Sequence, residues 1–151
     1  METYLMWAIL DLEVQNKPWF GSVASPFNPE NYIVATGWAI DNNPVQHEYF
    51  NSKEESLASD WLQRVLADQR MLVSHNSTFE LHWLLHNHFD VFLKWVNGGG
   101  RIFCTQMAEY MLTGQTEQYA KLEDLSVKYR DQGTDEHEVR KLDEVKILWD
   151  N

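Results

Sequence analysis

Residues 4–14 read YLMWAILDLEV, and this stretch decides the fold class. The unbroken apolar run from Leu5 to Leu10 predicts a strand over residues 4–12 that is buried on both faces. A strand of that kind lies at the centre of a sheet with helices packed on its two sides. We therefore expect an α/β protein built around this strand.

The segments that follow predict how the sheet continues. A turn at residues 41–44, Asp-Asn-Asn-Pro, separates two strand-like segments and indicates an antiparallel hairpin. Ser52 and Glu55 form a capping box that starts the first helix. Later strands that follow helices should lie parallel to the first, which gives a mixed sheet of three antiparallel and then two parallel strands, flanked by helices. The predicted elements are strands at residues 32–40, 45–50, 71–73 and 101–104, and further helices at 77–88, 105–111, 122–129 and 139–149.

The composition narrows the class of protein. The chain has 151 residues, 44% hydrophobic and 13% aromatic, so we expect one folded domain and no intrinsic disorder. Lys and Arg total 12 against 23 Asp and Glu, and the net charge of −11 excludes binding to nucleic acid by bulk attraction. Contact with a phosphodiester then needs a local cation. The single cysteine, the missing signal peptide and the lack of a membrane-spanning apolar run fit a reducing, cytosolic setting without a membrane partner.

Two carboxylates stand at the end of the first strand. Asp11 and Glu13 are two residues apart, so their side chains should project to the same side. Open α/β sheets bind their ligands at such strand ends. Like charges this close are unfavourable unless a cation lies between them, and Mg²⁺ prefers carboxylate oxygens. The alternative for an isolated pair of this kind is a solvated strand end.

A second polar cluster, Ser74-His75-Asn76-Ser77-Thr78-Phe79-Glu80, follows a buried strand and opens a helix. Glu80 is an acidic residue in an otherwise apolar helix start. A functional carboxylate and a carboxylate that simply stabilises the helix dipole are both compatible with this position. His75 and Asn76 lie at the strand-to-helix turn, where they either face the ligand crevice or serve the turn itself.

These segments resemble a known family. AILDLEV and SHNSTFELHWL resemble the first two motifs of the DEDD (DnaQ-like) 3′–5′ exonuclease superfamily. Three further segments, CTQMAEYMLTGQ, LEDLSVKY and KLDEVKILWDN, match in order, and the last resembles phage members close to the proofreading domain of family A DNA polymerases. The resemblance covers almost the whole chain. It implies a ribonuclease H-like fold and two-metal hydrolysis of phosphodiester bonds at a 3′ end.

The resemblance also implies roles for particular residues. Asp11, Glu13 and Glu80 would be catalytic carboxylates that ligate two divalent ions, Mg²⁺ or Mn²⁺. The substrate-binding residues it implies are Leu12 and Val14, which would flank the 3′ nucleotide, and His75, Asn76 and Phe79, near the substrate terminus.

Two departures from the family pattern stand out. The third motif, Tyr-x-x-x-Asp or His-x-x-x-x-Asp, has no clean copy, because Asp143 lies one residue too far from His137. Tyr129 fits the upstream LEDLSVKY segment instead. We therefore expect residues 1–151 to form one exonuclease-like domain that lacks the C-terminal third-motif helix. Cys104 stands where relatives usually carry a structural Asp.

The expected substrate is the 3′ end of single-stranded DNA, in a replication or proofreading role. The resemblance further implies a monomer, a DNA polymerase as a possible partner, and the host cytoplasm if a phage encodes the chain. Two alternatives stay open: a ribonuclease of the same superfamily, and the same fold without turnover as a nucleic-acid-binding or protein-interaction module. The loop aromatics Trp19, Phe20 and Phe27 either stack on unpaired bases or cover the core.

Overall fold

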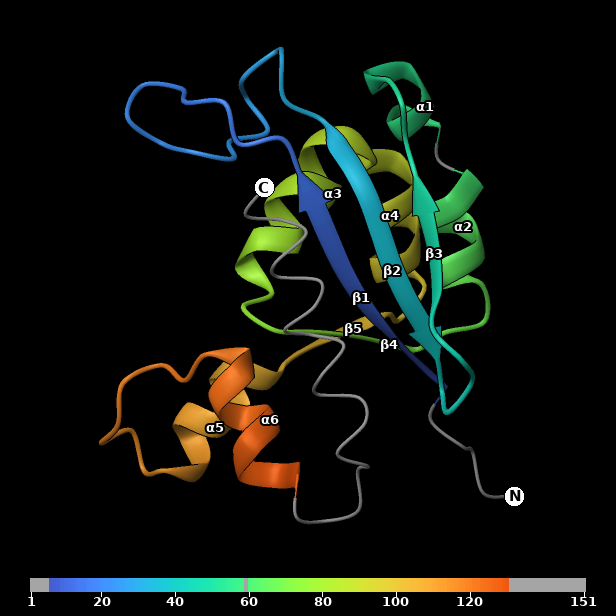
Figure 1. Ribbon diagram of the computed structural model, residues 1–151. Coiled ribbons are helices and arrows are strands. Elements are labelled where there is room, and N and C mark those ends of the chain that lie inside the picture. The colour runs from blue at the N-terminus through green and yellow to red at the C-terminus, as the bar shows by residue number, and fades with distance from the viewer. Residues whose placement is uncertain (1–5, 59, 131–151) are drawn as a thin grey trace.

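The computed structural model describes residues 6–58 and 60–130 (Figure 1). The strands are β1 (Trp7–Val14), β2 (Ile33–Ile40), β3 (Gln46–Tyr49), β4 (Met71–Ser74) and β5 (Arg101–Cys104). The helices are α1 (Lys53–Leu57), α2 (Asp60–Leu66), α3 (Thr78–Asn87), α4 (Phe89–Asn97), α5 (Thr105–Leu112) and α6 (Leu122–Arg130). None of these helices is long and apolar enough to cross a membrane.

The five strands form one mixed sheet in the order β3-β2-β1-β4-β5. β1 pairs antiparallel with β2 and parallel with β4, while β3 continues the antiparallel half and β5 the parallel half. This confirms the predicted fold class, an α/β protein whose helix-flanked mixed sheet is compatible with the ribonuclease H-like fold. β1 is the central strand, as its apolar run predicts.

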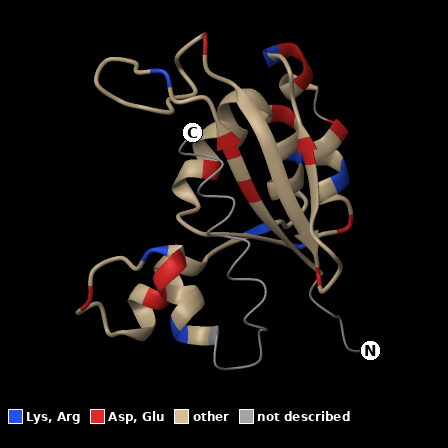
Figure 2. Cartoon of the chain, viewed as in Figure 1, with Lys and Arg blue, Asp and Glu red and all other residues tan. Residues whose placement is uncertain are grey.

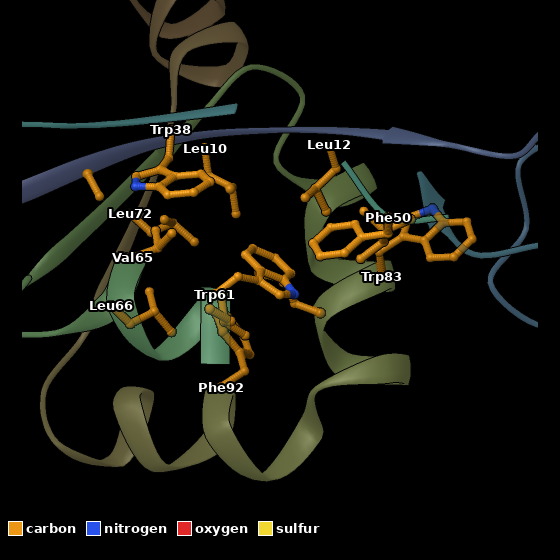
Figure 3. Close-up of a cluster of buried hydrophobic side chains, with 14 residues drawn as sticks. Leu10, Leu12, Trp38, Phe50, Trp61, Val65, Leu66, Leu72, Trp83 and Phe92 are labelled. Atoms are coloured by element: carbon orange, nitrogen blue, oxygen red, sulfur yellow. The ribbon is translucent and has the colours of Figure 1, made fainter. Parts of the chain in front are cut away.

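The core lies between one face of the sheet and helices α2, α3 and α4, which are behind the sheet in Figure 1. Alternate residues of β1 point into it: Ala8, Leu10 and Leu12 are all buried. Figure 3 shows the labelled aromatic rings, among them Trp61 and Trp83, filling the space beneath these strands. A fully buried side chain of this size contributes about 1.5–3 kcal/mol or more to folding.

The prediction that β1 is buried on both faces is wrong for the described residues. Its side chains alternate between buried and exposed, and Ile9, in the middle of the apolar run, is 43% exposed. The face that carries Ile9, Asp11 and Glu13 is not covered by a described helix. An apolar run allows burial on two faces, but only a second layer of helices can supply it.

The helices differ from expectation at two places. The helix that starts after Ser52 is divided, because Ala58 is extended (φ −63°, ψ 114°) and ends α1 before α2 begins. α4, residues 89–97, was not predicted. His88 (φ −134°, ψ 35°) is the single residue between the end of α3 and the start of α4. The helix predicted for residues 139–149 and the loop before it lie outside the described residues.

Candidate functional site

Asp11 and Glu13 lie on the open face of the sheet, near the carboxyl end of β1. They alternate with Leu10 and Leu12, whose side chains enter the core, so the pleat of the strand places both carboxylates on one side. The pairing of β1 with β2 shifts register between Glu13 and Val14. Such irregularities redirect side chains and are common beside functional sites. The predicted projection of the two acids to one side is confirmed.

Small residues on β2 stand beside these acids. Gly37 is the cross-strand partner of Asp11, and Ala35 is the partner of Glu13. A Cβ added at Gly37 would meet no atom closer than 4.0 Å. The space next to the carboxylates is therefore free of large side chains from β2. The sequence carries a signal for this opening in the small residues Ala35 and Gly37 of β2.

Glu80 lies in the first turn of α3 and is only 3% exposed. Its Oε2 atom is buried and has no hydrogen-bond partner among the described residues. Burial, together with the charge of Asp11, raises the pKa of Glu80 to about 7. Hydrogen bonds from its own backbone N–H and from Ser74 act in the opposite direction. A buried carboxylate with an unsatisfied oxygen is unfavourable and is typical of a site that binds a further group.

The three acids influence one another electrostatically. Partial burial raises the pKa of both Asp11 and Glu13, and the charge of Asp11 adds to the effect on Glu13 and on Glu80. Figure 2 shows acidic residues along β1, which carries no Lys or Arg. Within the described residues, no group of three or more His, Cys, Asp or Glu side chains is gathered to hold a metal ion. A cation bound by fewer protein ligands would relieve the mutual repulsion.

His75 is held at both ring nitrogens. Nδ1 lies 2.9 Å from the Thr105 hydroxyl and Nε2 lies 3.1 Å from the carbonyl oxygen of Ala120. A neutral ring that donates from Nε2 and accepts at Nδ1 satisfies both contacts. His75 thereby ties the end of β4 to the start of α5 and to the segment before α6.

The other sequence-predicted residues are placed as follows. Asn76 is exposed and adopts φ 55°, a left-handed conformation that Asn tolerates better than most residues. This fits the alternative that it serves the turn. Phe79 and Val14 are partly buried and pack against the core, and Leu12 lies within the core. Leu12 therefore points away from the face that carries Asp11 and Glu13.

Cys104 caps the N-terminus of α5. Its sulfur accepts backbone N–H groups from Met107 (3.4 Å) and from Ser77 (3.5 Å), the residue before α3. Capping by a side-chain acceptor is the task that an Asp performs at helix starts. Either Cys or Asp can therefore serve as a cap at position 104. The Cys104 sulfur also links the starts of α3 and α5.

The loop between β1 and β2 projects from the carboxyl end of β1, at the upper left of Figure 1. Phe20 is 93% exposed and Phe27 is 66% exposed, so the alternative that the loop aromatics cover the core is wrong for these two rings, whereas Trp19 is half-buried. Phe27 instead makes an edge contact with His86 of α3, with ring centroids 5.0 Å apart.

Comparison with known proteins adds little to this description. No family model and no curated protein matches the chain. Among solved structures, a family B DNA polymerase from the hyperthermophilic archaeon Pyrobaculum calidifontis is a weak structural neighbour, with 17% sequence identity and a TM-score of 0.43. The match covers 56% of this chain and 11% of the polymerase chain.

Proposed function

We propose that the chain is a metal-dependent 3′–5′ exonuclease that hydrolyses phosphodiester bonds at the 3′ end of single-stranded DNA. Asp11, Glu13 and Glu80 are its catalytic carboxylates. The observation that carries the proposal is Glu80, a buried carboxyl group with an unsatisfied oxygen, electrostatically coupled to an acid at the end of β1. The motif resemblance supplies the reaction, and the open face beside Gly37 and Ala35 leaves room for a substrate.

The donor set fits a hard divalent ion. Mg²⁺ is usually bound through one or two carboxylates and completes its coordination with water and substrate phosphates. A site of that kind agrees with the lack of a three-ligand cluster among residues 6–58 and 60–130. Asp11 and Glu13 would hold an ion directly, and Glu80 would act on a second one through water. The bound ions would supply an activated water and charge stabilisation for the departing 3′ oxygen.

The chain's own residues then have separable tasks. Asp11 and Glu13 concentrate negative charge on the open face and attract the cation that an acidic chain needs to approach a phosphodiester. Glu80, with a pKa of about 7, gives up its proton when a cation arrives, because a positive charge favours the ionised carboxylate. Phe79 belongs to the same segment as Glu80 and is proposed to contact the substrate terminus.

The first experiment is degradation of a 5′-labelled single-stranded oligonucleotide in the presence of Mn²⁺. The wild type should give a ladder that shortens from the 3′ end, and Asp11→Ala should lose at least 100-fold in rate, on the order of a lost charge-stabilising group. Asp90→Asn, at an exposed carboxylate in the first turn of α4, is the matched control and should keep full activity. Full activity in Asp11→Ala would rule out the assignment, and a 2′-hydroxyl version of the substrate tests the ribonuclease alternative.

A second candidate is the same fold acting as a binding module without turnover. The lack of a clean copy of the third motif in the sequence and the net charge of −11 favour it. In that case the oligonucleotide would bind but remain intact with every divalent ion, and Asp11→Ala would leave binding unchanged.

A further inference from the structure

The loop between β1 and β2 ends in a tight two-residue hairpin. Trp19 and Ser22 exchange backbone hydrogen bonds of 2.7 and 2.9 Å, with Phe20 and Gly21 between them. Both central residues have positive φ, 45° for Phe20 and 85° for Gly21. Positive φ at both positions defines a type I′ turn, for which Asn-Gly is strongly preferred.

Phe20 is therefore at odds with its local conformation. A bulky L-residue at positive φ is a genuine outlier, and such strain clusters at functional sites. The ring gains no burial in return, since it is 93% exposed and touches chiefly the edge of Trp19 (ring centroids 4.8 Å apart, planes at 78°). Neither turn chemistry nor packing explains a phenyl ring at this position.

The loop is rigidly built beneath this tip. Two buried asparagines cross-link it: the side chain of Asn31 bonds to the backbone of Lys17 and Ser25, and that of Asn28 bonds to the carbonyls of Lys17 and Pro18. These five bonds measure 2.9 to 3.2 Å. The ring is thus presented on a fixed platform, which reduces the entropy that a ligand must overcome on binding.

The loop between β1 and β2 adjoins both elements that carry the candidate catalytic acids, β1 and α3. It begins directly after β1, two residues past Glu13, and its Phe27 ring rests on His86 in the last turn of α3, whose first turn holds Glu80. A strand whose 3′ end lies at the acids therefore has the loop as its neighbour beyond the carboxyl end of β1.

We propose that the tip of this loop is a stacking site for an unpaired base of single-stranded nucleic acid, with Phe20 as the ring that stacks. This inference rests on the proposed function for the class of ligand. It agrees with the charge of the chain, because stacking needs no positive side chain, and the one lysine of the loop, Lys17, is paired with Glu30 at 3.2 Å. A protein partner fits less well, since stable protein interfaces bury about 800 Å² on each side, and the exposed large apolar side chains of this loop are Phe20, Val23 and Phe27.

Phe20→Asn tests the proposal without endangering the fold, because it installs the preferred residue of a type I′ turn. The melting temperature should equal or exceed that of the wild type. Binding of a fluorescent single-stranded oligonucleotide, measured by anisotropy with Ca²⁺ in place of Mn²⁺, should weaken about 5- to 100-fold, the usual effect of removing one stacking ring. Phe20→Trp should restore binding, and Val23→Asn, at an exposed apolar residue of the same loop without a ring, should leave it unchanged.

An oligonucleotide with abasic residues supplies the second arm. The wild type should bind the abasic strand more weakly than the normal strand. Phe20→Asn should bind both strands equally, because stacking needs both partners and this variant has already lost the ring. Equal binding of both strands by the wild type, unchanged binding by Phe20→Asn, or no binding by the wild type would each overturn the proposal. The first two results would leave the hydrolytic proposal standing, since hydrolysis is measured separately with Mn²⁺ and Asp11→Ala.

Discussion

Glu80 is the residue whose surroundings differ most from those of an ordinary surface carboxylate. In the unfolded chain it should lose its proton near the usual value of 4.5, whereas the folded protein retains that proton up to about pH 7. Between these values the folded state binds more protons, so stability falls as the pH rises. His88 acts in the opposite sense over an overlapping range, because burial lowers its pKa to about 4 and stability is lost as the pH falls from 6.5.

Removing the carboxyl group of Glu80 should therefore leave the effect of His88 on the pH dependence of stability without its opposing contribution. Glu80→Gln is expected to be more stable than the wild type by about 1–3 kcal/mol above pH 7 in the absence of divalent ions. Its stability should also rise with pH between roughly 4.5 and 6.5, where the wild type is nearly flat. Urea unfolding at a series of pH values measures both effects. Parallel curves for the variant and the wild type would show that Glu80 is not perturbed, and Asp90→Asn controls for the loss of a surface charge.

The sequence singles out the three acids as candidates, and their role stays a prediction, whereas their neighbours could not be foreseen. Asp11, Glu13 and Glu80 stand out because carboxylates are rare in apolar strands and helix starts. The strain at Phe20 could not be predicted, since Phe-Gly does not resemble a type I′ turn and its positive φ arises from the hydrogen bonds of Trp19 and Ser22.

Among the elements, β4, α5 and α6 are joined by several side chains, and His75 is one of them. His75 contacts the Thr105 hydroxyl and the Ala120 carbonyl, which also accepts a hydrogen bond from Gln106 Nε2 at 3.2 Å. His75→Ala removes both contacts and leaves the Ala120 carbonyl without this donor. Because Gln106 still donates to that carbonyl, we expect local opening of residues 113–121 to become easier by about 0.5–1.5 kcal/mol, the typical net effect of losing one hydrogen bond.

Hydrogen exchange measures this effect directly. Amides in residues 113–121 should exchange up to about tenfold faster in His75→Ala, while those of β1 and β4 keep their wild-type rates. Asn76→Gly is the control, because glycine accepts the φ of 55° at that position, and it should leave exchange unchanged. Unchanged exchange in His75→Ala, together with a higher KM, would instead point to a direct role in substrate binding.

The strands could be predicted more reliably than the division of the helices. Each strand is a short apolar segment next to turn residues, which is a local signal. The break at His88 contains no Gly or Pro, so the start of a new helix could not be predicted there. The helix itself has a sequence signal, because Phe89, Phe92, Leu93 and Val96 fall at the i, i+3, i+4, i+7 spacing of an amphipathic helix. The break depends on how α3 and α4 both pack behind the sheet, which is a tertiary effect.

The molecule as a whole is acidic, and this governs how it can meet nucleic acid. A basic protein that neutralises several phosphates gains about 10³- to 10⁵-fold in affinity when salt is lowered from about 200 to 50 mM. With a net charge of −11, the present chain has the opposite long-range field. We expect its affinity for single-stranded DNA, without divalent ions, to weaken as salt is lowered and to change less than about tenfold over that range.

Anisotropy titrations at several salt concentrations measure this slope. Adding Ca²⁺ should strengthen binding in the wild type and should do so less in Asp11→Ala, if a cation at the open face mediates the contact. A steep gain in affinity at low salt would show instead that a basic surface dominates binding.

The directions of the strands were predictable because hairpins pair antiparallel and helical crossovers return parallel. The open face was not predictable. Whether Ile9, Asp11 and Glu13 are covered depends on where the helices lie, and the periodicity of β1 alone is compatible with either outcome.

The central place of β1 also affects how the chain folds as it is synthesised. β2 and β3 leave the ribosome soon after β1 and can pair at once, but the other edge of β1 has to wait for residues 71–74. During that interval an apolar strand presents unpaired backbone groups to other nascent chains, which is a template for aggregation. Pairing two copies of β1 in parallel register would set Asp11 and Glu13 of one chain beside the same acids of the next. Like charges at that spacing repel, so the two carboxylates would oppose such self-association whether or not they take part in catalysis.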